Sequence, residues 1–190
     1  MRIRSALRIL LFLVLALALP HRGFAADPGI HIRSAEIVQN GDGYHLDASF
    51  QIELGTTLEE ALLRGVPLHF VTEFELVFER WYFLNLWNRT ISAFQQPYRL
   101  SYHALTRQYR LTAGALTQNV ETLAQALALM GRVRNRPIAA REDLESGVVY
   151  AAQVRLRLYP TQLPKPFLVS SIGSRNWNLS SDWYRWTISP

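Results

Sequence analysis

Cysteine is absent from this chain of 190 residues, and lysine occurs once, at Lys165. Without cysteine the protein has no disulfide, no thiolate metal ligand, no thiol nucleophile and no lipidated cysteine. Long apolar runs are also missing. The longest, residues 9–19, spans 11 residues, whereas a membrane-spanning helix needs ~20. We therefore expect a protein without disulfides and without a transmembrane segment in its mature form.

The N-terminal segment has the organisation of a secretory signal peptide. Three arginines precede the apolar run, and the small residues Gly23 and Ala25 follow it. Small side chains one and three residues before the cut are typical of a cleavage site. We therefore expect cleavage between Ala25 and Ala26, so that residues 1–25 are a removed signal peptide and the protein is periplasmic. An uncleaved anchor is the alternative, and the short apolar run argues against it.

The net charge of +5 comes mainly from this segment. Four of the 20 basic residues lie within residues 1–25 and no acidic residue does, which leaves 16 basic and 15 acidic residues in 26–190. A near-neutral chain gives no electrostatic reason to expect nucleic-acid binding. The length of 26–190 is typical of one domain, and we expect a single domain there.

Alternation of apolar and polar residues predicts strands through most of this domain. The clearest runs from Tyr44 to Leu54, and the turn-forming Asn40–Gly43 joins it to the preceding strand as a hairpin. One-sided strands in antiparallel pairs indicate a mainly β protein, an antiparallel two-sheet β-sandwich. The predicted strands are 30–39, 44–54, 68–78, 98–102, 109–111 and 150–158.

Two short helices are expected between the strands. Thr57 and Glu60 match a capping box, and a helix from there to about Arg64 would end at Gly65. A second helix is predicted over residues 120–130, where apolar residues recur at helical spacing. Residues 132–146 show little periodicity, and we expect them to cross between the sheets.

The histidines are the only available imidazole ligands for a metal. They lie on predicted strands and lack the tight paired spacing that is typical of metal sites. A solvated strand face explains them better, because histidine is commonly exposed. No metal site or cofactor is therefore expected from the four that follow the signal peptide, which are His31, His45, His69 and His103.

Two glutamates offer a second chemical possibility. Glu73 and Glu75 share one face of a predicted strand, about 7 Å apart, which is compatible with the carboxylates of an inverting glycosidase. Arg155 and Arg157 share a face of another predicted strand, so cross-strand ion pairs are the structural alternative. No pattern of substrate-binding residues surrounds the glutamates, and the sequence assigns no catalytic residue.

Aromatic residues are concentrated in two places. Residues 81–87 form an almost continuous apolar run, which one strand face cannot bury, and further tryptophans lie near the C-terminus. These residues either pack in the core or contact a partner, because aromatics are abundant in both settings. The candidate partner-binding residues are Trp81, Tyr82, Phe83, Trp87, Trp177 and Trp183.

Several segments together resemble a known family. They are 58–68, 99–111, 163–167 and 177–183. Their order and content are similar to a proteobacterial family of exported proteins, domain of unknown function 4390. The resemblance covers nearly all of the mature chain and implies a bacterial envelope location and a link to sensor histidine kinases. The family usually has an aspartate after the strand that ends near Leu158, and this chain departs from the family there with Tyr159.

The sequence therefore favours a periplasmic protein that acts by binding an envelope or membrane-anchored protein. One alternative is an accessory subunit that modulates a membrane sensor histidine kinase. Another is an envelope hydrolase that uses paired carboxylates. A deep polar cleft would favour the hydrolase, and an apolar contact patch would favour binding.

Overall fold

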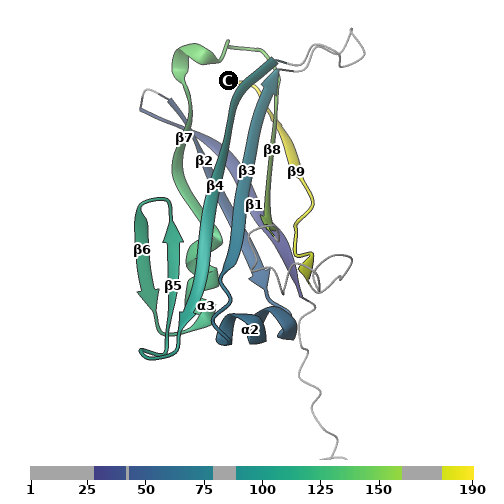
Figure 1. The fold of residues 1–190 in the computed structure, drawn as a ribbon. Helices are drawn as coiled ribbons and strands as arrows, with labels where there is room; N and C mark the ends of the chain where they lie inside the picture. The colour runs from purple at the N-terminus through teal and green to yellow at the C-terminus, as the bar shows by residue number, and fades with distance from the viewer. Residues whose placement is uncertain (1–27, 42, 79–88, 160–176) are drawn as a thin grey trace, which may run out of the picture.

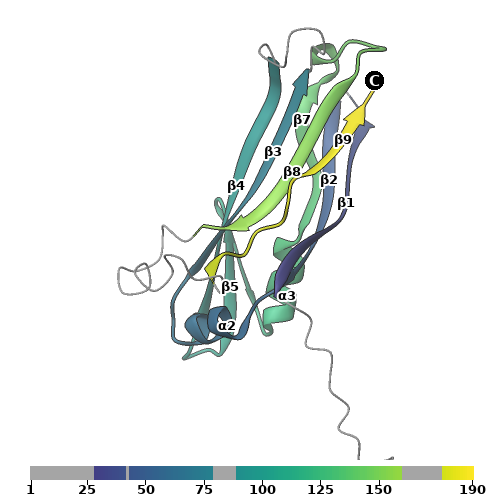
Figure 2. The same cartoon turned by 90° about the vertical axis from the view of Figure 1, so that its right-hand side faces the viewer.

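The computed structural model describes residues 28–41, 43–78, 89–159 and 177–190. Within these residues, nine strands form two antiparallel sheets that pack face to face, and Figures 1 and 2 show the two layers from perpendicular directions. The predicted mainly β, two-sheet sandwich is confirmed. The predicted signal peptide, with its cut between Ala25 and Ala26, lies outside the described residues.

The smaller sheet has three strands. Its order is β1-β2-β7, with β1 at Gly29–Asn40, β2 at Gly43–Glu53 and β7 at Arg132–Ala140. The hairpin between β1 and β2 forms as predicted, with Gly41 at a positive φ of 59°, a conformation that glycine adopts without strain.

The larger sheet has six strands in the order β6-β5-β4-β3-β8-β9. Because β3 lies between β4 and β8, residues from distant parts of the chain become neighbours in its centre. The strand bounds are β3 Leu68–Phe78, β4 Arg89–His103, β5 Gln108–Ala113, β6 Leu116–Val120, β8 Tyr150–Leu158 and β9 Tyr184–Ile188.

The core lies between the sheets and follows the predicted alternation. Phe50 of β2 and Phe74 of β3 are 5% and 1% exposed, and both belong to one hydrophobic cluster. Thr72 is fully buried on the same face of β3, as its place in the alternation predicts. Strands β2 and β8 show this most fully, with one apolar face in the core and one polar face outside.

Both helices form, but α2 begins earlier than predicted and α3 begins later. Helix α2 spans Thr56–Leu63 with Gly55 as its N-cap and no side-chain cap, so the capping box predicted at Thr57 and Glu60 is wrong. The extended Gly55 already accepts the first helical hydrogen bonds through its carbonyl oxygen, which places Thr57 inside the first turn. The end at Gly65 is as predicted, with φ 85°.

Helix α3 spans Leu123–Met130, three residues shorter than predicted at its start. Val120 belongs to β6, where it pairs with Tyr109. The helix begins after Thr122, whose hydroxyl accepts the Gln125 N–H at 3.2 Å while the Gln125 side chain accepts the Thr122 N–H at 3.3 Å. This reciprocal capping box satisfies two backbone donors and fixes the start.

The expectation that residues 132–146 cross between the sheets without a strand is wrong for their first part. Residues 132–140 form β7 and pair with β2, and only the 3-10 turn Arg141–Asp143 and the residues after it make the crossing. Asn135, at a positive φ of 48°, lies where the pairing register shifts. This bulge removes the alternation from which a strand is recognised.

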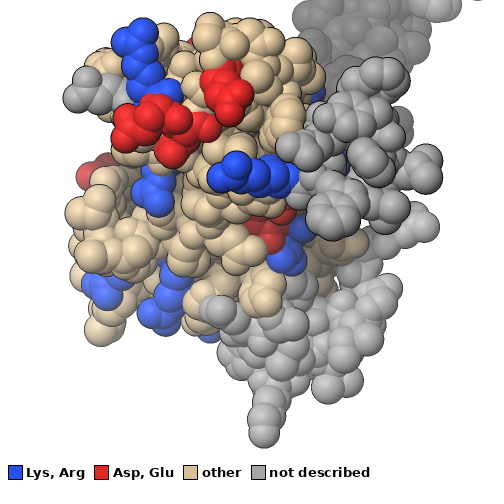
Figure 3. All heavy atoms as spheres, turned by 90° about the horizontal axis from the view of Figure 1, so that it is seen from above, with Lys and Arg blue, Asp and Glu red and all other residues tan. Residues whose placement is uncertain are grey.

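Charges are mixed on the end of the molecule that carries the C-terminus. Figure 3 looks onto this end and shows acidic and basic side chains side by side.

Among the described residues no helix is long and apolar enough to cross a membrane.

Candidate functional site

The outer face of the larger sheet carries a cluster of charged side chains centred on Glu73. On β3, Glu73 alternates with the core residues Thr72 and Phe74, so it faces away from the core. The strand register places Gln95 of β4 on one side of it and Arg155 of β8 on the other. Side chains that are directly opposite on one face of a sheet are close enough to interact.

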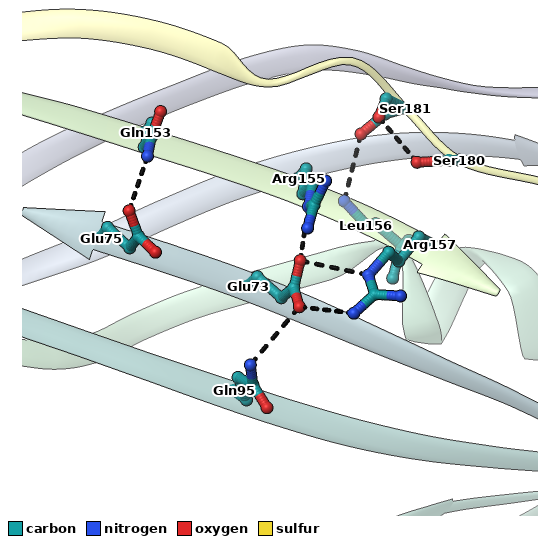
Figure 4. A network of polar contacts seen from close by, with 9 residues as sticks. All are labelled: Glu73, Glu75, Gln95, Gln153, Arg155, Leu156, Arg157, Ser180 and Ser181. Carbon is teal, nitrogen blue, oxygen red and sulfur yellow. Dashed lines mark hydrogen bonds and ion pairs between the residues drawn. The ribbon is translucent and has the colours of Figure 1, made fainter. Parts of the chain in front are cut away.

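The Glu73 carboxylate accepts hydrogen bonds from three side chains. Arg157 donates to both of its oxygens, at 2.9 Å from Nη2 and 3.2 Å from Nε, and Arg155 Nε donates to Oε2. Gln95 makes a longer contact of 3.4 Å to Oε1. Figure 4 shows all four contacts converging on this one carboxylate. The cross-strand ion pairs predicted from the sequence therefore form.

This environment fixes the charge of Glu73. The Arg157 hydrogen bonds lower the pKa of Glu73, burial opposes them, and the Arg155 hydrogen bond lowers the pKa further. In return, the carboxylate raises the pKa of Arg157. The Glu73 side chain is 8% exposed and those of Arg155 and Arg157 are 29% and 28% exposed. Glu73 is thus an ionised, enclosed carboxylate at neutral pH.

Two aromatic rings cover the arginines. The Arg155 guanidinium carbon lies 4.3 Å from the centre of the Trp183 ring, and that of Arg157 lies 5.0 Å from the Tyr159 ring. Both distances are within the range of cation–π attraction. Trp183 is partly buried, and Tyr159 is 37% exposed. The cluster therefore presents aromatic surface to the outside while its charges are paired beneath.

A second polar row lies beside the cluster. Gln153 of β8 donates to Glu75 at 2.6 Å and accepts from Arg185 Nε of β9 at 2.9 Å. Glu73 and Glu75 therefore share a face, as predicted, but each has its own partners. Among the described residues the two carboxylates share no hydrogen-bond donor.

Two shallow hollows flank Gln95 on this face. One has a volume of about 240 Å³ and is lined by Glu73, Glu75 and Trp183. The other, of about 260 Å³, lies against Val71, Pro97 and Tyr159. These volumes are below the ~300–1,000 Å³ typical of small-molecule pockets. The face suits contact with a broad partner surface better than enclosure of a substrate.

The predicted partner-binding residues have different positions. Trp183 lies in the cluster. Trp177 is 5% exposed and belongs to the hydrophobic cluster, so it offers a partner little surface. Trp81, Tyr82, Phe83 and Trp87 lie outside the described residues.

The histidines occupy separate positions on the strands. In the described part of the chain, no three residues of the metal-binding types are grouped so that they could hold an ion. Burial and the nearby Arg99 lower the pKa of His69, which favours its neutral form.

Two cluster members were not found from the sequence, Gln95 and Tyr159. Gln95 belongs to the first half of β4, where Ser92 and Gln96 interrupt the apolar face and hide the alternation. Tyr159 follows the last residue of β8. The sequence feature that points to Tyr159 is its spacing: it follows Arg157 by two residues, as Arg157 follows Arg155.

The chain matches a family profile along nearly its whole length. The profile, described as domain of unknown function (DUF4390), matches residues 27–187. The chain belongs to the DUF4390 family. The predicted family is thus confirmed, and every residue of the Glu73 cluster lies within the DUF4390 match. Neither the curated proteins nor the solved structures include a significant match.

Proposed function

We propose that this protein is a non-catalytic binding protein of the bacterial envelope, located in the periplasm, and that it contacts a partner protein through the Glu73 cluster and its two covering rings. The observation that carries this proposal is the pairing of charges beneath exposed aromatic surface. Trp183 and Tyr159 lie over arginines that are already bound to Glu73. Tryptophan, tyrosine and arginine are the residues most enriched at binding hot spots.

The same geometry argues against the hydrolase alternative. A glycosidase acid needs a raised pKa so that it holds a proton at neutral pH. The pKa of Glu73 is lowered instead, and its oxygens are occupied by arginine and glutamine donors. Glu75 is held by Gln153. At Glu73, neither the proton nor the open carboxylate that this mechanism requires is supported.

The binding role also fits the rigidity of the face. Glu73, Gln95 and the two arginines come from three neighbouring strands, β3, β4 and β8, whose backbone pairing fixes their positions. Tyr159 directly follows β8, and Trp183 directly precedes β9. The rings are held by stacking on arginines that are themselves anchored to one carboxylate. A partner therefore meets a surface that needs little ordering on binding, which lowers the entropic cost of association.

Site-specific photo-crosslinking in living cells tests the proposal. A photoreactive phenylalanine analogue in place of Tyr159 should give one defined adduct to an envelope protein, and Trp183→Ala should weaken it. Val38, which is 43% exposed on the smaller sheet, is the control position and should not give the adduct. An identical adduct from Val38, or none from Tyr159 in a correctly folded, exported protein, would refute the proposed surface. If the captured protein is a membrane sensor histidine kinase, the role becomes that of its accessory subunit.

A further inference from the structure

The two sheets differ in width, and this leaves part of the larger sheet's inner face without an opposing strand. The larger sheet extends through β4, β5 and β6, whereas the smaller one ends at β7. Figure 1 shows the β5–β6 hairpin projecting to the side of β4. Of the described elements, helix α3 rather than a strand lies against this hairpin. On the inner face of the hairpin, Leu111 is buried, whereas Leu116 at the outer side is 70% exposed.

A groove of about 340 Å³ runs between the inner face of β4–β6 and strand β7. Phe94, Tyr98 and Leu111 belong to its apolar floor. Two leucines at its side are exposed to an unusual degree, Leu116 of β6 at 70% and Leu129 of α3 at 40%. Exposed apolar side chains that gather around a groove are typical of an interaction site.

The charge around this groove has one sign. Its lining includes Arg132, Arg134 and Arg136, all exposed and all from β7, and no aspartate or glutamate. Arg134 lies 3.6 Å from Asp47, and the Arg136 guanidinium lies 5.0 Å from the centre of the Phe94 ring. Within the described part of the chain, Arg132 and Arg136 form no ion pair. The groove therefore combines an apolar floor with cations that are available to an acidic ligand.

We propose that this groove binds an extended, acidic segment of a partner protein, with apolar side chains on the floor and carboxylates at Arg132 and Arg136. An extended chain presents alternate side chains to opposite sides, so one row meets the leucines while the other meets the arginines.

The spacing of the arginines favours a peptide over a lipid headgroup. Arg132 and Arg136 are four residues apart on a bulged strand, a backbone separation of roughly 10–13 Å. Carboxylates that alternate along an extended peptide can reach both, whereas one lipid headgroup offers a single cluster of charge. Pro137 has no N–H to offer on this edge strand, so side chains, rather than an added strand, hold the segment.

This surface is separate from the Glu73 cluster, because it lies on the inner face of the larger sheet and the cluster lies on the outer face. The inference therefore does not depend on the proposed function. A protein with both surfaces could hold two partners, or two parts of one partner, at the same time.

A labelled peptide of about seven residues, with glutamate and leucine alternating, provides the probe, and fluorescence anisotropy with the full mature chain provides the measurement. We expect saturable binding that weakens as ionic strength rises. The Arg132→Glu/Arg136→Glu variant should bind at least about tenfold more weakly, and Leu116→Ser should also weaken binding. Circular dichroism confirms that each variant is folded.

The matched control is Arg99→Glu/Arg110→Glu, which changes the net charge equally on the outer face of the same sheet. It should leave peptide affinity within about twofold of the original. The proposal is overturned if the acidic peptide does not bind, if a lysine–leucine peptide binds equally well, or if the control variant loses as much affinity. Vesicles of phosphatidylglycerol that bind through Arg132 and Arg136 when the peptide does not would also overturn it.

Discussion

Replacing Glu73 by glutamine removes one negative charge while nearly keeping the size of the side chain. In the folded protein this charge accepts hydrogen bonds from Arg155, Arg157 and Gln95. Glutamine offers one acceptor oxygen and two N–H donors, and the donors would face the arginines. The substitution therefore leaves two cations on the sheet without their shared anion.

The expected loss of stability follows from the contacts and their exposure. A hydrogen bond to a charged group contributes about 1.5–3 kcal/mol, and breaking a buried ion pair costs about 3–5 kcal/mol. The arginine side chains are 28–29% exposed, so water can solvate them again and recover part of this. We therefore expect Glu73→Gln to lower the free energy of unfolding by about 2–3 kcal/mol at neutral pH.

The dependence on pH has a defined sign. The folded-state pKa of Glu73 lies below its ordinary value of 4.5, chiefly because of the Arg157 hydrogen bonds. The contribution of Glu73 to stability is therefore complete above pH 4.5 and is lost as the pH falls through the lower pKa that Glu73 has in the folded protein. Glutamine does not titrate, so the difference between the original protein and Glu73→Gln should shrink as the solution is acidified below 4.5.

Urea unfolding followed by tryptophan fluorescence measures both effects. The matched control is Glu75→Gln on the same strand face, where the carboxylate has an amide partner and no arginine. We expect it to cost about 1 kcal/mol. The reasoning fails if Glu73→Gln stays within about 0.5 kcal/mol of the original protein at neutral pH, or if the difference between them does not change with pH.

Four further results are expected. Phe50→Ala and Phe74→Ala should each cost about 3–5 kcal/mol in urea unfolding, because both rings are buried in one core; losses below about 1 kcal/mol in both would contradict that packing. Gly131→Ala should cost about 1–3 kcal/mol, because its new methyl group would meet the Phe50 carbonyl oxygen, and an unchanged melt would show that the backbone can yield there. Intact-mass measurement of exported protein should give a chain that begins at Ala26, and full-length protein in the inner membrane would rule this out. Trp87→Ala should keep the melting temperature and weaken partner capture; a large drop in melting temperature, or undiminished capture, would exclude an interface role.

The parts of the fold that were predictable are the strands with one buried face. In β2, β3 and β8 nearly every second residue is apolar and is buried in the core, so the sequence alone shows the alternation. Strand β7 was missed because exposed arginines, Pro137 and the bulge at Asn135 interrupt its pattern. Pairing with β2, which lies far away in the sequence, makes these residues a strand despite that pattern, and no residue within 132–140 signals it.

For the site, the sequence predicts which charged residues share a strand face, but not that the two faces meet. Placing Glu73 and Glu75 on one face, and Arg155 and Arg157 on another, needed only the strand period of two. Their meeting depends on β3 and β8 being neighbours, and Glu73 and Arg155 are 82 residues apart. One sequence defines which residues share a face but not which strands lie together. The start of α3 was misplaced for a related reason, because Val120 fits the helical spacing but pairs with Tyr109 in β6.

The position of β3 between β4 and β8 has a consequence for how the chain folds. β4 follows β3 closely in the chain, but β8 is complete only at Leu158. Pairings between distant segments carry a large loop-closure cost and slow folding. Until β8 is made, one edge of β3 is open and Glu73 lacks its arginines. A chain stopped before β8 would therefore expose an unpaired strand with an apolar face, a form prone to aggregate, and completion of the sheet is a late step for the nascent protein.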